Sequence, residues 1–174
     1  TAMEWHLHIH LALLSCYRAD WTSAKTSLGQ LREVARRPSA LNAELLEQWT
    51  AYITGVVNQG TGDTDAAISS FQSPSLSLPT SPSNRSLSIQ QDLAILAALN
   101  TLLIVRDPSH PSHHRADALL STLEPLCLTH PNKALTSCLH LIRAVSPSTR
   151  TGSTPSIVKT KQSIQLALQD RKST

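Results

Sequence analysis

Residues 55–71 read GVVNQGTGDTDAAISSF, and this stretch decides between two very different folds. Its glycines could form a loop that holds a phosphate group, or they could form the corner between two helices. A phosphate-binding loop follows a strand, and the Walker type also needs a Lys followed by Ser or Thr. Both are missing here. We therefore expect a structural corner in which Gly60 and Gly62 end one helix and free the backbone for positive φ. Asp63 is expected to cap the next helix.

The residues around this corner follow the spacing of a tetratricopeptide repeat, a hairpin of two helices called A and B. In that repeat, small residues let helices A and B approach each other, and a large apolar residue fills the groove to the next repeat. Two sets of residues have this spacing, at steps of seven, five and four and 43 positions apart: Ala12, Ala19, Ala24 and Leu28, and Gly55, Gly62, Ala67 and Phe71. Seven of these residues are expected to pack the hairpins: Ala12, Ala24, Leu28, Gly55, Gly62, Ala67 and Phe71. Gly62→Val and Ala67→Leu should each cost about 1–3 kcal/mol.

The rest of the 174-residue chain is also helical in pattern. Hydrophobic residues make up 40% of it and aromatic residues only 3%, and the prevalence of Leu and Ala favours helices over strands. Turn-forming residues separate the predicted helices, which cover about 4–17, 21–37, 41–59, 63–72, 87–106, 114–130, 132–145 and 156–170. Pro125 predicts a kink or an early stop in one of them. The predicted fold is all-α, a tetratricopeptide-like α-solenoid of about eight helices in antiparallel hairpins.

The predicted helices divide the chain into three parts. Residues 1–72 hold the two tetratricopeptide-like hairpins, and residues 73–86 form a linker or an extended connection rich in Ser and Pro. Residues 87–174 form further, divergent hairpins. The last predicted helix has no clear C-cap. We therefore expect the chain to be part of a longer solenoid.

Several function classes find no support in the sequence. There is no run of 18 apolar residues to span a membrane and no basic segment typical of a signal peptide at the start. The three cysteines lack a C-x-x-C spacing, and the serines lack the G-x-S-x-G motif. His6 and His10 share a helix face, but apart from Glu4 no third metal ligand lies nearby. We expect a non-enzymatic protein with no metal, cofactor, small-molecule substrate or membrane contact.

One segment resembles a known family. Residues 49–72, WTAYITGVVNQGTGDTDAAISSFQ, are similar to the cohesin-loading-factor family, the tetratricopeptide subunit of the cohesin loader, and residues 159–169, KTKQSIQLALQ, look like another of its helices. Family members are several times longer than this chain. The resemblance implies a nuclear, chromatin-associated adaptor that wraps the extended N-terminal segment of the large HEAT-repeat loader subunit. In that role it would support loading of cohesin onto chromosomes and sister chromatid cohesion.

A stripe on each helix A is the predicted partner-binding groove. Its members recur at three- and four-residue steps: His6, Ile9, Leu13, Tyr17, Trp49, Tyr52, Val56 and Gln59. The competing interpretation is that this apolar stripe belongs to the core. An alternative function is a generic helical-repeat regulator of protein interactions that touches nucleic acid through basic residues such as Arg32, Arg36 and Arg37.

Overall fold

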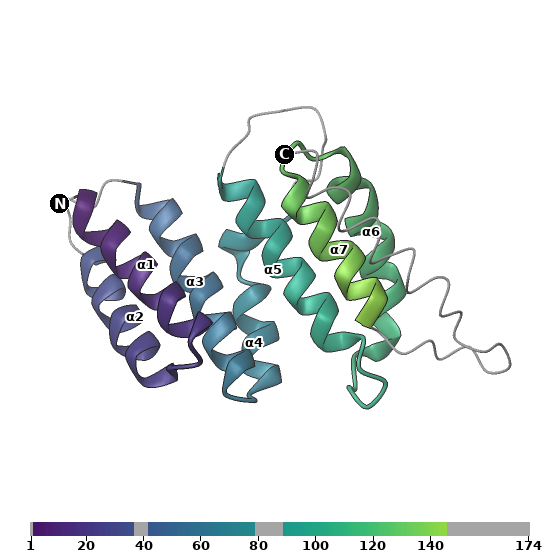
Figure 1. Ribbon diagram of the computed structural model, residues 1–174, viewed down its shortest axis with the longest axis horizontal. Helices are drawn as coiled ribbons and strands as arrows, with labels where there is room; N and C mark the ends of the chain where they lie inside the picture. The colour runs from purple at the N-terminus through teal and green to yellow at the C-terminus, as the bar shows by residue number, and fades with distance from the viewer. Residues whose placement is uncertain (1, 37–41, 79–88, 146–174) are drawn as a thin grey trace, which may run out of the picture. The chain divides into compact units, whose positions relative to one another are not determined.

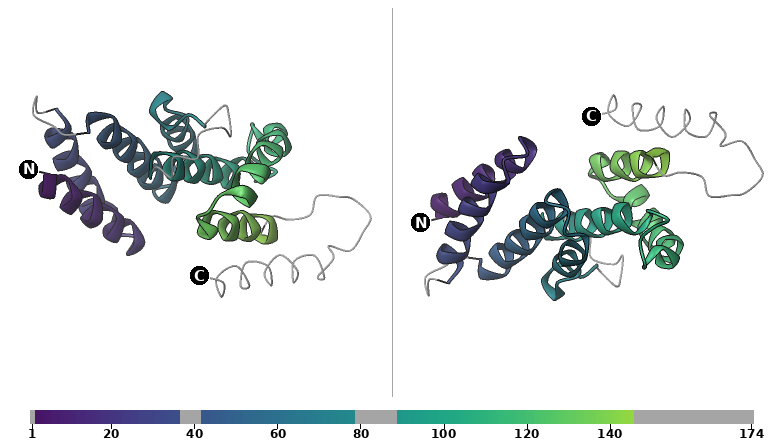
Figure 2. Two further views of the ribbon diagram at one scale, coloured as in Figure 1. Left: turned by 90° about the horizontal axis from the view of Figure 1, so that it is seen from above. Right: turned by 90° about the horizontal axis from the view of Figure 1, so that it is seen from below.

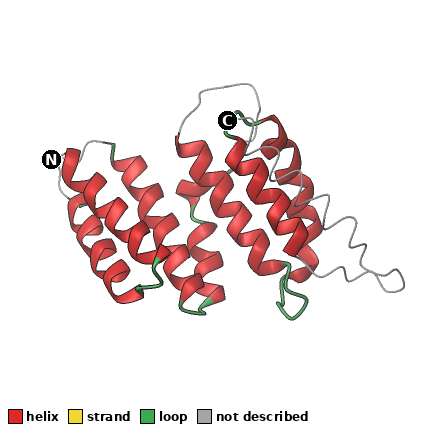
Figure 3. Cartoon of the chain, viewed as in Figure 1, coloured by secondary structure: helices red, strands yellow, loops and turns green. Residues whose placement is uncertain are grey.

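The computed structural model describes residues 2–36, 42–78 and 89–145, and all of its regular structure in these ranges is helical (Figures 1 and 3). The helices are α1 (Ala2–Tyr17), α2 (Trp21–Ala35), α3 (Ala43–Gly60), α4 (Thr64–Phe71), α5 (Ile89–Val105), α6 (Ala116–Thr129) and α7 (Lys133–Val145), with 3-10 turns η1 (Pro74–Leu76) and η2 (His113–Arg115). The all-α prediction is confirmed. The predicted helix at 156–170 lies outside the described residues, and the solenoid arrangement stays a prediction.

The described residues pack into two compact units that divide within α5. The first unit holds α1 to α4, η1 and the part of α5 up to Ala97. The second holds the remainder of α5 with η2, α6 and α7. In the first unit α1 packs on α2 and α3 on α4, and α2 also packs on α3 (Figure 2).

The turns within the two hairpins have the same geometry. In each turn a residue with positive φ, Ala19 (φ 56°) or Gly62 (φ 87°), ends the first helix, and an aspartate follows it. The backbone hydrogen bonds that close the turns are, with N···O distances, Ala19 to Cys16 (3.0 Å), Gly62 to Gln59 (3.2 Å), Asp20 to Ser15 (2.9 Å) and Asp63 to Asn58 (2.9 Å). This pattern is a Schellman motif, which satisfies carbonyl groups left free at the helix end.

The same two aspartates begin the second helices. Asp20 and Asp63 have identical backbone angles, φ −86° and ψ 80°. The Asp20 carboxylate accepts a hydrogen bond from the Ser23 N–H at 3.1 Å, and the Asp63 carboxylate accepts one from the Ala66 N–H at 3.0 Å. Each aspartate therefore closes one helix through its own N–H and caps the next through its side chain. The expected cap at Asp63 and positive φ at Gly62 are confirmed.

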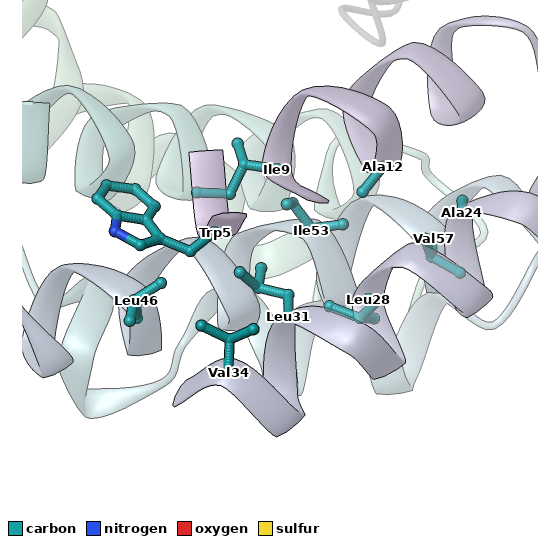
Figure 4. Close-up of a cluster of buried hydrophobic side chains, with 10 residues drawn as sticks. All are labelled: Trp5, Ile9, Ala12, Ala24, Leu28, Leu31, Val34, Leu46, Ile53 and Val57. Atoms are coloured by element: carbon teal, nitrogen blue, oxygen red, sulfur yellow. The ribbon is translucent and has the colours of Figure 1, made fainter. Parts of the chain in front are cut away.

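Side chains from three helices form the core of the first unit (Figure 4). The buried members are Trp5, Ile9 and Ala12 of α1, Ala24, Leu28, Leu31 and Val34 of α2, and Leu46, Ile53 and Val57 of α3. Ala12 and Ala24 are fully buried, as close packing between α1 and α2 requires. Of the positions that match the repeat spacing, Ala12, Ala24 and Leu28 lie in this core. Gly55 of α3 and Ala67 and Phe71 of α4 are also buried, whereas Ala19 and Gly62 are exposed in the turns.

Two glycines of α3 mark close approaches to neighbouring helices. A Cβ atom on Gly55 would overlap the Phe71 ring of α4, and one on Gly60 would overlap the Trp21 ring of α2. Gly60 was expected to free the backbone for positive φ, but it lies within the helix. Its missing side chain makes room for Trp21 instead.

The start of the predicted linker is packed rather than extended. Pro74–Leu76 form η1, which contacts α3, and the Leu76 side chain is only 3% exposed. The Ser73 and Ser75 hydroxyls are hydrogen bonded to each other at 3.0 Å. Residues 79–86 of the predicted linker lie outside the described residues.

The second unit contains a helix pair, α6 and α7, held by apolar and polar contacts. Leu123, Cys127, Leu135 and Leu139 are fully buried. The Thr136 hydroxyl donates to the Cys127 carbonyl at 2.7 Å, and Arg143 pairs with Glu124 at 2.7 Å. The early stop at Pro125 is wrong, because α6 continues to Thr129. Pro125 is exposed, so water can satisfy the carbonyl that loses its N–H donor.

Candidate functional site: the helix A stripe

The two hairpins define which residues of α1 and α3 occupy equivalent positions. The matched turns relate residues that are 43 positions apart, such as Asp20 and Asp63. In this register His6 corresponds to Trp49, Ile9 to Tyr52 and Leu13 to Val56. Three of the four predicted positions on each helix are therefore true equivalents.

The fourth position differs between the two helices. Gln59 of α3 corresponds to Cys16 of α1, whereas Tyr17 corresponds to Gly60. Cys16 is partly buried against the core, while Tyr17 is 90% exposed. The sequence pattern alone missed Cys16. Cys16 lies three residues after Leu13 and Tyr17 lies four residues after it, and both spacings keep a residue on the same face of a helix. The 43-residue register separates the two, so we define the helix A stripe as His6, Ile9, Leu13, Cys16, Trp49, Tyr52, Val56 and Gln59.

Exposure varies along the stripe. On α1, His6 is exposed, Leu13 is half-buried, and Ile9 is only 3% exposed within the core. Ile9 therefore has almost no surface to offer a partner. On α3 all four members are half-buried: Trp49, Tyr52, Val56 and Gln59. The α3 half offers the more continuous surface for contact.

Aromatic side chains anchor the α3 half of the stripe. The Trp49 and Tyr52 rings meet edge to face with centroids 6.3 Å apart, and the Tyr52 ring lies 6.0 Å from the Phe71 ring of α4. Trp49 and Tyr52 also pack on the core of the first unit. These contacts fix the two side chains in place, which lowers the entropy that a binding partner would have to overcome. Rigid Trp and Tyr side chains are frequent anchors in protein interfaces.

The cysteines are in environments that disfavour nucleophilic chemistry. Burial raises the pKa of the Cys16 thiol and of the Cys138 thiol. Burial, with a smaller effect from Cys138, raises the pKa of Cys127 to about 11. A raised pKa keeps the thiol protonated at neutral pH, and the thiolate is the reactive form.

Arg32 of α2 and Arg36, the residue that caps the end of α2, interact within the protein. The Arg32 guanidinium donates to the Thr54 hydroxyl of α3 at 3.0 Å, and Arg36 pairs with Glu33 at 2.9 Å. Arg37 lies outside the described residues. The two described arginines thus have interaction partners within the protein.

Three other features of the described residues bear on the type of site. No group of three or more His, Cys, Asp or Glu side chains in residues 2–36, 42–78 and 89–145 could hold a metal ion. Within the same ranges, no helix has the length and apolar character needed to cross a membrane. An open pocket of about 490 Å³ lies between α1 and α2, away from the stripe, and is lined by Glu4, His8, Lys25, Thr26, Gly29, Gln30, Glu33 and Val34.

Comparison with known proteins identifies the family. The family model described as cohesin loading factor matches residues 1–174, the whole of the chain. Comparisons with curated proteins and with solved structures gave no match. Because the family model covers every residue, the resemblance seen at residues 49–72 extends to the chain as a whole. The chain belongs to the cohesin loading factor family, and this membership gives it a role in cohesin loading.

Proposed function

We propose that the chain is a non-catalytic helical-repeat adaptor that binds the extended N-terminal segment of the large HEAT-repeat subunit of the cohesin loader. Cohesin loading is a chromosome-associated role in the nucleus, and it requires protein partners. The finer proposal is that the partner segment lies along the helix A stripe. Through this contact the chain would support sister chromatid cohesion.

The repetition of the helix A stripe is the observation that carries the proposal. Equivalent side chains on α1 and α3 follow from two hairpins with the same turn geometry. Stacked helix A faces of this kind line a groove in helical-repeat proteins, and an extended peptide can contact several repeats at once. The half-buried Trp49, Tyr52 and Val56 supply apolar anchors in that groove.

Binding measurements with stripe variants test the proposal. The partner is a fluorescently labelled N-terminal segment of the large loader subunit, titrated with the chain and followed by anisotropy. Trp49→Ala and Tyr52→Ala should each weaken binding by about 1–2 kcal/mol, roughly a 5- to 30-fold rise in Kd. Because Tyr52 also contacts Phe71, each variant is first checked for an unchanged helical circular-dichroism signal.

A matched control separates the stripe from the remaining surface. Leu128 of α6 is 45% exposed and lies in the second unit, outside the stripe. Leu128→Ala should leave the Kd unchanged. If both stripe variants stay folded and bind as tightly as the parent chain, the stripe is not the binding surface. Loss of folding in both variants would instead assign the stripe to the core.

A further inference from the structure

Ser73 joins the end of α4 to the turn η1. Its N–H donates to the Ser70 carbonyl in the last turn of α4 at 3.2 Å, and its carbonyl accepts from the Leu76 N–H at 2.9 Å. Its hydroxyl is hydrogen bonded to the Ser75 hydroxyl at 3.0 Å. Every polar group of Ser73 therefore helps to hold this junction.

Pro74 gives Ser73 the backbone of a kinase substrate. A proline disfavours helical angles in the residue before it, and Ser73 adopts φ −53° and ψ 140°, which is extended backbone. Proline-directed kinases bind their substrates in an extended form and select a proline directly after the acceptor hydroxyl. Ser73 is half-buried and Pro74 is exposed, so both residues reach the surface of the first unit.

One buried side chain docks η1. Leu76 is the buried residue of η1, which contacts α3. On the other side of Ser73, the buried Phe71 ring lies 6.0 Å from the Tyr52 ring of α3. Ser73 thus lies between two buried side chains. Because η1 contributes a single buried side chain, it can open locally at a smaller cost in free energy than the helices.

We propose that Ser73 is a phosphorylation site for a proline-directed kinase, and that phosphorylation releases η1 from α3. The kinase transfers the γ-phosphoryl group of ATP to Ser73 Oγ. The hydroxyl proton passes to the general base of the kinase, and ADP leaves. This site is distinct from the helix A stripe, and either proposal can fail without the other.

The release follows from the charge that the phosphate adds. A phosphoserine carries about 1.5 to 2 negative charges at neutral pH. At position 73 these charges lie at the C-terminal end of α4, where the carbonyl groups already carry negative partial charge. Keeping them half-buried would also cost hydration. The phosphate therefore moves into water, and the hydrogen bonds that join α4 to η1 break.

Phosphorylation in vitro tests the assignment of the site. The folded chain is incubated with ATP and a purified mitogen-activated protein kinase, and mass spectrometry locates the phosphate. A peptide of residues 69–79 is the positive control for the kinase. We expect most chains to be phosphorylated at Ser73. An unmodified Ser73 in the chain, under conditions that modify the peptide, would overturn the proposal.

NMR and hydrogen exchange test the release of η1. In the phosphorylated chain the amide resonances of Leu76 and Ser77 should move toward random-coil positions. The Leu76 amide, which has lost its Ser73 acceptor, should exchange at least about tenfold faster. Further Ser-Pro or Thr-Pro pairs begin at Ser81, Ser146 and Thr154, so a Ser73→Ala chain is treated in parallel and should show neither change. The proposal fails if Leu76 stays protected in a chain phosphorylated at Ser73.

Ser69 provides a matched control for the added charge. It is exposed and lies near the same end of α4. Ser73→Glu should shift the Leu76 resonance in the same direction as the phosphate, and by less, because it adds one charge. Ser69→Glu adds that charge without touching the junction and should leave Leu76 in place. Equal shifts from the two variants would contradict a specific role of Ser73.

Discussion

Residues 19 and 62 occupy the same left-handed position in two equivalent turns but differ in side chain. Gly62 adopts φ 87° and Ala19 adopts φ 56°. Glycine reaches such angles without steric cost, whereas an L-residue is strained there by about 1–2 kcal/mol. The first turn therefore stores strain that the second turn avoids, although their hydrogen bonds match.

Exchanging the residues should shift stability in opposite directions. Ala19→Gly should stabilise the chain by about 0.5–1 kcal/mol, since relief of strain is partly offset by the greater freedom of glycine in the unfolded chain. Gly62→Ala should destabilise it by about 1 kcal/mol. Urea denaturation followed by circular dichroism measures both. If Ala19→Gly destabilises, the left-handed turn at residue 19 is not formed.

The buried thiol of Cys127 predicts a loss of stability at high pH. Its pKa is raised from 9.0 in the unfolded chain to about 11. Folding therefore favours the protonated thiol, and this contribution is fully present below about pH 9 and is lost as the pH rises through about 11. The melting temperature of the chain should fall as the pH rises from about 9 to about 11. The melting temperature of the Cys127→Ala variant should fall less steeply over the same range. Equal slopes for the parent and the variant would show that Cys127 is not buried in solution.

At the scale of helices, the two hairpins solve the same packing problem with different pairs of side chains. Ala12 and Leu28 of the first hairpin correspond to Gly55 and Phe71 of the second. All four residues are buried, and a Cβ atom on Gly55 would overlap the Phe71 ring. A smaller residue on helix A thus accompanies a larger one on helix B.

A double-mutant cycle tests this complementarity. Gly55→Ala should destabilise the chain by about 1–3 kcal/mol, because the new methyl group must displace the Phe71 ring. Adding Phe71→Leu recreates the pair of the first hairpin and should recover part of the loss. The coupling free energy between the two changes should be favourable and at least about 0.5 kcal/mol. Additive effects, with no coupling, would mean that the two positions do not pack on each other.

Sequence reasoning succeeded where structure depends on local chemistry. The corner at Gly62 and Asp63 was predictable because a left-handed residue and a capping carboxylate each follow from residue type. It failed where the packing of a neighbouring helix decides whether a side chain is buried or exposed. Ile9 is in the predicted stripe but lies in the core. Tyr17 is also in the predicted stripe, but it is 90% exposed and Cys16 takes its place in the register. Helical spacing groups residues by face but cannot say which neighbour covers that face.

The start of the predicted linker shows the same limit. Ser- and Pro-rich composition suggested an extended segment, yet Leu76 is buried and η1 contacts α3. Composition describes the segment as a whole. It therefore does not reveal that one apolar residue, Leu76, is buried in a turn that contacts α3. Pro125 is the converse case, because a residue that usually ends a helix is tolerated at an exposed position of α6.

At the scale of the whole molecule, family membership gives the chain its role, and the helix A stripe is the proposed surface for that role. The family model covers the entire chain, which gives the protein its role in cohesin loading. The helix A stripe is the surface that we propose for binding the large loader subunit.

Site-specific photo-crosslinking tests whether the partner segment lies along the helix A stripe. A photoreactive residue replaces either Val56 in the stripe or Ser69, an exposed residue of α4 in the same hairpin, and each chain is mixed with the N-terminal segment of the large loader subunit. We expect an efficient crosslink from position 56 and little from position 69, with the linked residues of the segment identified by mass spectrometry. A crosslink from position 69 that equals or exceeds that from position 56 would contradict binding along the stripe.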